Sequence, residues 1–551
     1  MDSLIKGDGS RRSGIKRMGI AVAAVLLLAV LGVMLFYNPP LSVPGDFRTI
    51  QAAVDAARDG DVIVVQPGMY FERIDFMGKN ITIRSSDPDD PAVVASTIID
   101  GRRRGSVVTF QGGEGAGAVL EGFTISGGSG TQEILSHESE GVTVDNEGYF
   151  GGGILVRGGS SPTIAKNIIT GNSVERDGGG IAVLEGSSPL IMHNTIVENR
   201  AFNGAGIFVW ASHPTIDSNT LNENSAMNAG AAISIDFESA PIVTNNRIHN
   251  NSATSGGGIA VWNADPNITG NIIGDNHAIW FGGGISVFNA SPTIGNNDIS
   301  ENRAENNGGG IAVAEGASPV ISGNTIANNY SSQSGGGISI TEGSSPTIND
   351  NEITENAALF GGGGIYVRES SPRIEGNNIT GNLVQQDGGG IAIMTNSAPN
   401  VINNTIGANV AGRAGGGLVI GDNSSPTIEG NNITGNDSPQ GGGMIVQRSS
   451  PVILENTIAD NMSESGGGIL VISESTLTIA GNNFTGNKAI KLGGALNVFV
   501  TSVVVLERNT FIGNEAEEGG AVWVLRGSTL ERKVPDDNVF SDNIPDDIFQ
   551  D

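Results

Sequence analysis

Short alternating runs of hydrophobic and polar residues recur along most of the chain. Each unit reads roughly GGGIxVxxxSSPTIxxNxIxxNxA, in which Ile-x-Val and Thr-Ile segments alternate with Gly, Asn, Ser and Pro. The first Asn of the unit recurs 15 times from Asn167 to Asn538, about every 26 residues. Short β-rich segments between turn-forming residues predict strands, and the repeat has no helical periodicity. The pattern therefore predicts a parallel β-solenoid in which two or three strands of each coil pair with the neighbouring coils.

The columns of this repeat predict where each residue type lies. Alternation along a strand points Ile and Val of GGGIxV inward, together with the aliphatic residue two positions after the first Asn. We expect the two Asn residues of each unit, such as Asn431 and Asn436, to stack at two corners, because buried amides need hydrogen-bond partners. The Gly triplet is expected to form a third corner with positive φ. A feature repeated in every coil is interpreted as structural rather than catalytic.

The N-terminal part of the chain predicts export and anchoring. Residues 18–37 form a 20-residue stretch without a charged side chain, and five basic residues precede it. This length spans a bilayer as a helix, and the basic flank is expected to stay in the cytoplasm. Bulky residues stand where a signal-peptide cleavage site needs small ones. We therefore expect a single-pass anchor in the cell membrane with an extracytoplasmic C-terminal domain; secretion after cleavage of the N-terminal segment is the alternative.

Changes of pattern divide the chain into segments. Within 45–60, Ile50, Ala53, Val54 and Ala57 have helical spacing and predict a helix that caps the open sheet edge of the solenoid. The predicted segments are a cytoplasmic basic tail (1–17), a transmembrane anchor (18–37), a linker (38–44), an N-terminal cap with the first coils (45–128), a loop insertion (129–150), regular repeats (151–543) and a C-terminal tail (544–551).

Charge and composition narrow the partners. The chain has a formal net charge of −29 and contains no Cys. An acidic surface repels phosphates, so no nucleic-acid partner is expected, whereas neutral or cationic partners and divalent cations are compatible with it. The same charge also keeps a long exported rod soluble. Without Cys there is neither a disulfide framework nor a lipid-modified Cys, so stability must come from packing.

Two stretches resemble known proteins. TIQAAVDAARDGDVIVVQPGMYFERIDF and NITIRSS resemble the start of bacterial β-helix proteins of the pectin-lyase-like superfamily, and NTFIGNEAEEGGAVWV is similar to repeats of polymorphic outer-membrane adhesins. The resemblance implies an all-β, single-stranded, right-handed parallel β-helix. Members include pectate lyases, polygalacturonases, phage tailspikes and adhesins, but the Gly-His-Gly, Arg-Ile-Lys and Trp-Ile-Asp-His motifs of the enzymes are missing. The resemblance therefore predicts the fold and leaves the activity open.

One outward-facing column contains the candidate ligand and catalytic residues. The position after Ile-x-Val is Trp210, Asp236, Trp262 and Phe288 in four successive coils, and Phe208 flanks Trp210. Exposed aromatic faces stack on sugar rings, which predicts a polysaccharide-binding stripe; packing against a loop around Trp280 and Phe281 is the alternative. Asp236, with Glu238 as a second carboxylate, is the candidate catalytic pair of a polysaccharide lyase or glycoside hydrolase.

A second column is acidic. Glu315, Glu342 and Glu369 occupy one register position in three consecutive coils. Ca²⁺ prefers clustered oxygen ligands and could bridge them, and a solvated acidic stripe is the alternative. Three functions remain open from the sequence: a surface module that binds polysaccharide or a cell-surface glycan, a polysaccharide lyase or glycoside hydrolase, and a structural envelope spacer. The sequence does not indicate an oligomeric state.

Overall fold

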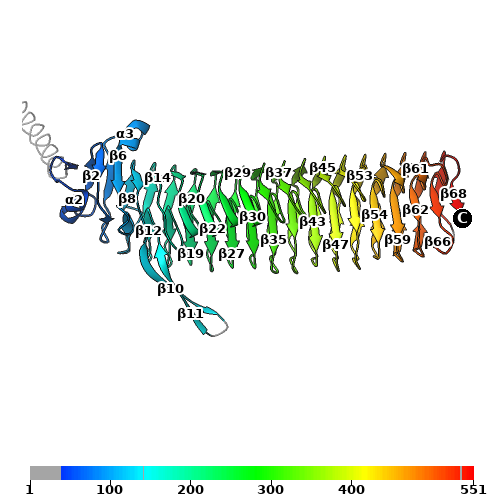
Figure 1. Cartoon of the computed structure of the whole chain (residues 1–551), viewed down its shortest axis with the longest axis horizontal. Coiled ribbons are helices and arrows are strands. Elements are labelled where there is room, and N and C mark those ends of the chain that lie inside the picture. The colour runs from blue at the N-terminus through cyan, green and yellow to red at the C-terminus, as the bar shows by residue number, and fades with distance from the viewer. Residues whose placement is uncertain (1–38, 140–141, 534–535) are drawn as a thin grey trace, which may run out of the picture.

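The computed structural model describes residues 39–139, 142–533 and 536–551. These residues form a long rod of stacked coils with its strands across the rod axis (Figure 1). Within them, no helix is long and apolar enough to cross a membrane. The predicted cytoplasmic tail (1–17) and anchor (18–37) lie outside the described residues.

Parallel sheets run along the rod. The second regular coil shows the plan: β16 (Leu190–Met192) follows Pro189, β17 (Thr195–Val197) follows the first Asn, and β15 (Ile181–Val183) follows the Gly corner. The sheet that contains β16 has 19 strands in the described chain. Strands pair residue for residue with the next coil, as β15 does with β19 (Ile207–Trp210). A nine-stranded fourth sheet, from β18 (Arg200–Asn203) to β50 (Val410–Ala411), occupies the segment between the second Asn and the Gly corner. The predicted parallel β-solenoid is confirmed.

The core is a continuous column of aliphatic side chains. Ile181, Val183, Ile191 and Ile196 of one coil are fully buried, and their equivalents in the other regular coils are buried too, except that Phe540 in the last coil is partly buried. These are the positions that alternation predicts to face inward. Each coil therefore buries its apolar face against the coils on both sides of it.

Two ladders of Asn side chains stabilise two corners, as expected. In one coil, the backbone N–H and Nδ2 of Asn329 both donate to Oδ1 of Asn356 at 3.0 Å, and Nδ2 also donates to the Ile299 carbonyl at 2.8 Å. Oδ1 of Asn329 accepts the same pair of donors from Asn302. This arrangement repeats from Asn167 to Asn538 and from Asn172 to Asn543. The Asn amide oxygen accepts hydrogen bonds and the amide NH₂ donates them. Each Asn can therefore accept from one neighbouring Asn and donate to the other, which explains why Asn recurs in this column.

Both ladders end at acidic side chains. Each Asn donates toward the C-terminus, so the last one in each ladder needs a different acceptor. Nδ2 of Asn538 donates to Asp536 at 2.8 Å, and Nδ2 of Asn543 donates to Asp547 at 2.9 Å. The hydrogen bond from the Asn538 side chain is the main cause that lowers the pKa of Asp536. The ladder donors are therefore satisfied at the end of the rod.

The Gly corner has two different requirements. The first Gly of the triplet has φ between 55° and 75° in every regular coil from Gly151 to Gly519. At the other two positions, the backbone of the next coil is close instead, and Ala replaces Gly at 205, 231, 232, 495 and 521. The predicted positive φ is thus correct for the first Gly only.

A column of Ser residues forms a third ladder that the sequence analysis missed. The backbone N–H of Ser370 donates to Oγ of Ser397 at 3.3 Å, and the contact repeats in each coil to Ser528. Ala264, Ala290 and Ala317 occupy the same column in earlier coils, which obscures the repeat.

The predicted N-terminal helix is α2 (Ile50–Ala56), at the N-terminal end of the solenoid (Figure 1). Thr49 accepts a hydrogen bond from Ala52 N–H, and the Glu72 carboxylate accepts from the N–H groups of Ile50 and Gln51 at 3.0 Å. Free N–H groups at a helix start need such acceptors. A second helix, α3 (Pro91–Ser96), follows β5 (Thr82–Ser85).

Three predicted segments contain strands that the sequence analysis did not predict. Residues 41–43 of the predicted linker are instead strand β1 (Leu41–Val43), which pairs with β2 (Val62–Val65) and buries Val43. The predicted tail contains β68 (Ile548–Gln550), paired with β65 (Val522–Val524). The predicted loop 129–150 is an antiparallel hairpin of β10 (Thr131–Ser139) and β11 (Val142–Phe150), which projects from the rod (Figure 1). Backbone pairing explains each difference, and β1 and the hairpin also bury apolar residues.

Candidate functional site

The predicted aromatic stripe is largely covered. Phe208, Trp210 and Phe288 are only 2%, 9% and 3% exposed, so the expectation of an exposed stripe is wrong for them. The base of the hairpin packs Leu135 and Phe150 against Phe208 and Trp210. The ring centroids of Phe150 and Phe208 are 6.2 Å apart. The structure therefore shows the alternative of intramolecular packing: hairpin residues pack on Phe208 and Trp210, and Phe281 packs on Phe288, as the alternative expected.

Aromatic surface is exposed instead on β30 (His277–Phe281). Trp280 is 54% exposed and lies edge-on to Phe281, with centroids 6.2 Å apart. The ring centroids of Phe281 and Phe288 are 6.0 Å apart, and those of Phe288 and the half-buried Trp262 are 4.5 Å apart. These four rings form one cluster, which we call the Trp280 cluster. The sequence contains a signal for this exposed cluster. Where the segment between the second Asn and the Gly corner has five residues, its third and fourth residues protrude. Met227 and Ile490 are further examples.

The candidate catalytic carboxylates have different surroundings. Asp236 ends β23 (Ile233–Asp236) and lies in register between Trp210 and Trp262, as the repeat predicts. Its side chain is half-buried and accepts a hydrogen bond from Phe237 N–H at 2.7 Å. Glu238 is exposed in the turn that follows the strand, with φ +52°. Their catalytic role stays a prediction.

A buried carboxyl that the sequence analysis missed lies near the base of the hairpin. Asp177 precedes the Gly178 corner, and its backbone N–H donates to the Tyr149 carbonyl of β11 at 3.3 Å. The pKa of Asp177 is raised to about 7: burial is the largest cause and the charge of Asp236 adds to it, against the opposing effects of Arg176 and hydrogen bonds from Asn203. A carboxyl that titrates near neutral pH is a candidate functional group as well as a source of pH-dependent stability.

The Asp177→Asn variant is expected to remove a pH-dependent loss of stability. Because the folded-state pKa is raised above the unfolded value near 4, the protonated form stabilises the fold below about pH 4, and this stability is lost as pH rises through about 7. An Asn can still accept from Asn203 N–H. Urea unfolding should show that the free energy of unfolding of the variant, relative to that of the parent, increases by about 1–4 kcal/mol between pH 5 and pH 8.

Asp460→Asn is the matched control, because it removes an exposed carboxylate. Its stability relative to the parent should not change between the two pH values. If Asp177→Asn and the parent had parallel pH profiles, the raised pKa of Asp177 would be wrong.

The predicted calcium ligands do not converge. Glu315, Glu342 and Glu369 lie in turns with φ of 57°, 57° and 51°, beyond the ends of their strands. Burial, and then the charge of Glu342, raise the pKa of Glu315, whereas Glu369 forms an ion pair with Arg368 at 3.2 Å. In the part of the chain that the structure describes, no three His, Cys, Asp or Glu residues are grouped so that they could hold a metal ion. The geometry favours the alternative, a solvated acidic stripe.

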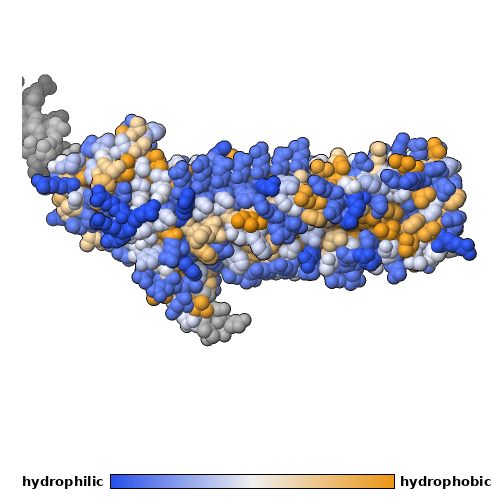
Figure 2. Space-filling model, viewed as in Figure 1, coloured by the Kyte–Doolittle hydropathy of each residue, from blue (hydrophilic) through white to orange (hydrophobic). Residues whose placement is uncertain are grey.

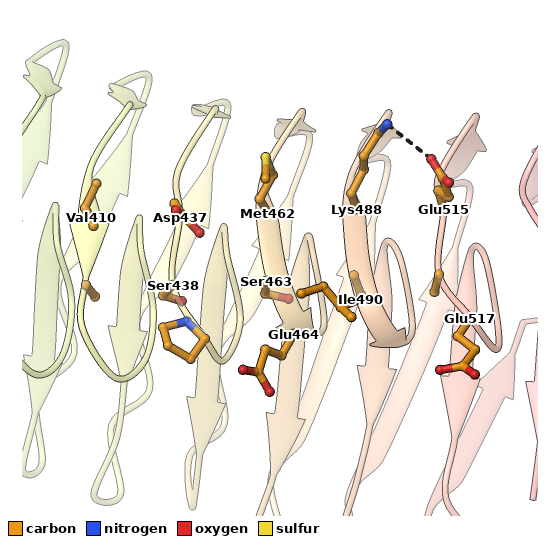
Figure 3. A pocket seen from close by; sticks show the side chains of 14 residues that line it. Val410, Asp437, Ser438, Met462, Ser463, Glu464, Lys488, Ile490, Glu515 and Glu517 are labelled. Carbon is orange, nitrogen blue, oxygen red and sulfur yellow. Dashed lines mark ion pairs between the residues drawn. The ribbon is translucent and has the colours of Figure 1, made fainter.

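A groove of about 690 Å³ crosses five coils near the C-terminal end, between Val410 and Glu517 (Figure 3). We call it the C-terminal groove. Its origin is the length of the segment between the second Asn and the Gly corner. This segment has five residues in 410–414 and 488–492 but four in 437–440, 462–465 and 515–518. The shorter segments lack one protruding residue, which leaves a depression beside the longer ones.

Comparison with known proteins agrees with this architecture. The sequence model of the family described as "Right handed beta helix region" matches residues 106–273, 267–406 and 337–543, and the chain therefore belongs to this family. The predicted right-handed parallel β-helix is confirmed, in keeping with the resemblance to the pectin-lyase-like superfamily. No curated protein matches the chain. Among solved structures, a mutant of the PL6 family alginate lyase AlyGC matches with 11% identity over 93% of this chain and 97% of its own, at a TM-score of 0.24. A likeness of that size supports no functional argument.

Proposed function

We propose that the chain is a membrane-anchored extracytoplasmic module that presents the Trp280 cluster to a polysaccharide or cell-surface glycan. The exposure of Trp280, which lies edge-on to Phe281, is the observation that carries the proposal, because flat aromatic faces with a polar rim stack well on sugar rings. Residues 18–37 would anchor the rod, and α2 would cover its open N-terminal edge. Release by cleavage of the N-terminal segment would leave the same binding surface.

The surroundings of Trp280 favour an uncharged glycan. Ile279 is exposed beside Trp280 in the same strand, and Met227 is exposed two strands away in the same sheet. The net charge of −29 opposes binding of uronic-acid polymers at low salt. The proposed ligand is therefore a neutral polysaccharide.

Replacing Trp280 with Ala is expected to weaken retention of the full-length chain on an immobilised neutral glycan by about tenfold, which corresponds to the loss of one aromatic stacking contact. Affinity chromatography of the detergent-solubilised protein measures this. Phe360→Ala is a matched control, because Phe360 is an exposed aromatic residue at the equivalent position three coils further on. Unchanged retention of the Trp280 variant would reject this surface as the glycan site.

One observation favours a catalytic alternative. A carboxyl with a pKa near 7, such as Asp177, can act as a general acid at neutral pH, and the charged Asp236 influences it. Because the hairpin base covers this region, catalysis there would require the hairpin to move. Under this alternative, the chain would release unsaturated or reducing ends from a polysaccharide, and Asp236→Asn would abolish them.

A further inference from the structure

The C-terminal groove runs along the rod and has a regular build (Figure 3). Its floor consists of small buried residues, each two positions after the second Asn of its coil: Ala411, Ser438, Ser463, Ala489 and Ala516. Since neighbouring coils are about 4.8 Å apart, five coils give a trough roughly 19 Å long between the first and last floor residues. Such a trough fits an extended chain that lies parallel to the rod axis.

The groove has apolar side chains that the rod leaves uncovered. Val410 and Met462 are exposed on one wall, and Ile490, on the other, is 69% exposed. Figure 2 shows hydrophobic side chains gathered over the C-terminal part of the rod. Clustered exposed apolar groups are typical of a site that receives a ligand.

The charges of the groove select the ligand. Lys488 pairs with Glu515 at 3.1 Å, and Glu464 pairs with Lys491 at 3.1 Å. The exposed carboxylates Asp437 and Glu517 have no ion-pair partner within the described ranges. Two free negative charges therefore stand three coils apart along an apolar trough, which is complementary to a ligand with two separated positive charges.

We propose that the C-terminal groove binds an extended basic peptide segment of a partner protein. Two Lys or Arg side chains of the peptide pair with Asp437 and Glu517, and an aliphatic side chain between them packs against Met462 and Ile490. Asp437 and Glu517 are three coils apart, about 14 Å along the rod, and an extended chain rises about 3.4 Å per residue. The two basic residues are therefore about four positions apart. β61 (Lys488–Leu492), which lines the groove, lies far along the rod from β30, the strand that contains Trp280, so this proposal is independent of glycan binding (Figure 1).

A designed peptide tests this assignment. A fluorescently labelled peptide containing Lys-Ser-Leu-Ser-Lys between flanking glycines is titrated with the full-length chain in detergent, and its anisotropy is measured at low and physiological ionic strength. It should bind, and more weakly at the higher ionic strength, because salt screens exposed charges. The double variant Asp437→Asn, Glu517→Gln should weaken binding by about fivefold, the sum of two modest surface ion pairs.

Two controls separate the groove from general charge attraction. Glu301→Gln with Glu355→Gln removes the same two charges at exposed positions outside the groove and should leave binding unchanged. A peptide with its two Lys residues adjacent should bind more weakly than the spaced one. Ile490→Ser should also weaken binding, and circular dichroism of each variant checks that the rod remains folded.

Several results would overturn the proposal. One is equal binding by the parent and the Asp437, Glu517 double variant. Another is equal binding of the Lys peptide and its Glu counterpart, or of the spaced and adjacent Lys peptides. Displacement of the labelled peptide by a neutral oligosaccharide would assign the groove to a glycan instead.

Discussion

Asn329→Asp should destabilise the rod by several kcal/mol at neutral pH, whereas Asn328→Asp, one residue earlier, should have almost no effect. Asn329 is buried in the second Asn ladder, and its Nδ2 donates to Ile299 O and Asn356 Oδ1. An Asp loses both donors and places a buried carboxylate beside the Asn356 oxygen, which costs far more than one neutral hydrogen bond. Asn328 is exposed in a turn, where other coils have Asp275 and Asp460.

The effect of Asn329→Asp should depend on pH. Burial raises the pKa of the new carboxyl above its unfolded value near 4, so its protonated form is favoured in the folded rod. The stability that protonation supplies is present below about pH 4 and is lost as pH rises through the raised value. Denaturant unfolding should therefore show a smaller deficit at pH 4 than at pH 8. Equal deficits for Asn329→Asp and Asn328→Asp at pH 8 would mean that the ladder does not stabilise the corner.

Gly415→Ala should cost at least about 3 kcal/mol, and Gly343→Ala about 1 kcal/mol, although both residues have positive φ. Both variants pay the cost of a side chain in the left-handed region, with φ +66° at Gly415 and +75° at Gly343. Only at Gly415 does a Cβ also meet backbone, 2.3 Å from the Leu418 carbonyl oxygen. At Gly343 no atom lies within 4 Å of it.

The pair separates backbone strain from steric overlap, because the two substitutions are chemically identical. Denaturant midpoints of both variants, measured at one pH, give the comparison. A cost at Gly415 no larger than at Gly343 would show that the corner relaxes, and the constant Gly in this column would then need another explanation.

The sequence predicted those features that depend on a single column of the repeat. Asn329 and its equivalents, the aliphatic core and the first Gly of each corner could be assigned because one residue type recurs at one spacing, and stacking of equal side chains is its direct consequence. The Ser ladder was not predicted because Ala interrupts its column in three coils. Strands β1 and β68 were not predicted because they belong to coils that lack the repeat motif.

The residues that surround the candidate site could not be predicted from any single position of the sequence repeat. Trp210 was expected to be exposed because its strand position faces outward, but Leu135 and Phe150 of the irregular insertion and Phe237 of the next coil pack around it. The raised pKa of Asp177 likewise depends mainly on burial, which is a tertiary property. The C-terminal groove, in contrast, was encoded in the sequence as segments of four instead of five residues. Its detection requires knowing that the extra residue protrudes.

Incubating the full-length chain with a panel of neutral and uronic-acid polysaccharides, with Ca²⁺ or with chelator, tests the central claim most directly. Retention on the glycan and release of new unsaturated or reducing ends are followed in the same samples. The account predicts retention on one or more neutral polysaccharides, without product and without dependence on Ca²⁺. Product formation would contradict a binding module and identify an enzyme, whereas the absence of both signals would contradict glycan binding and favour a spacer.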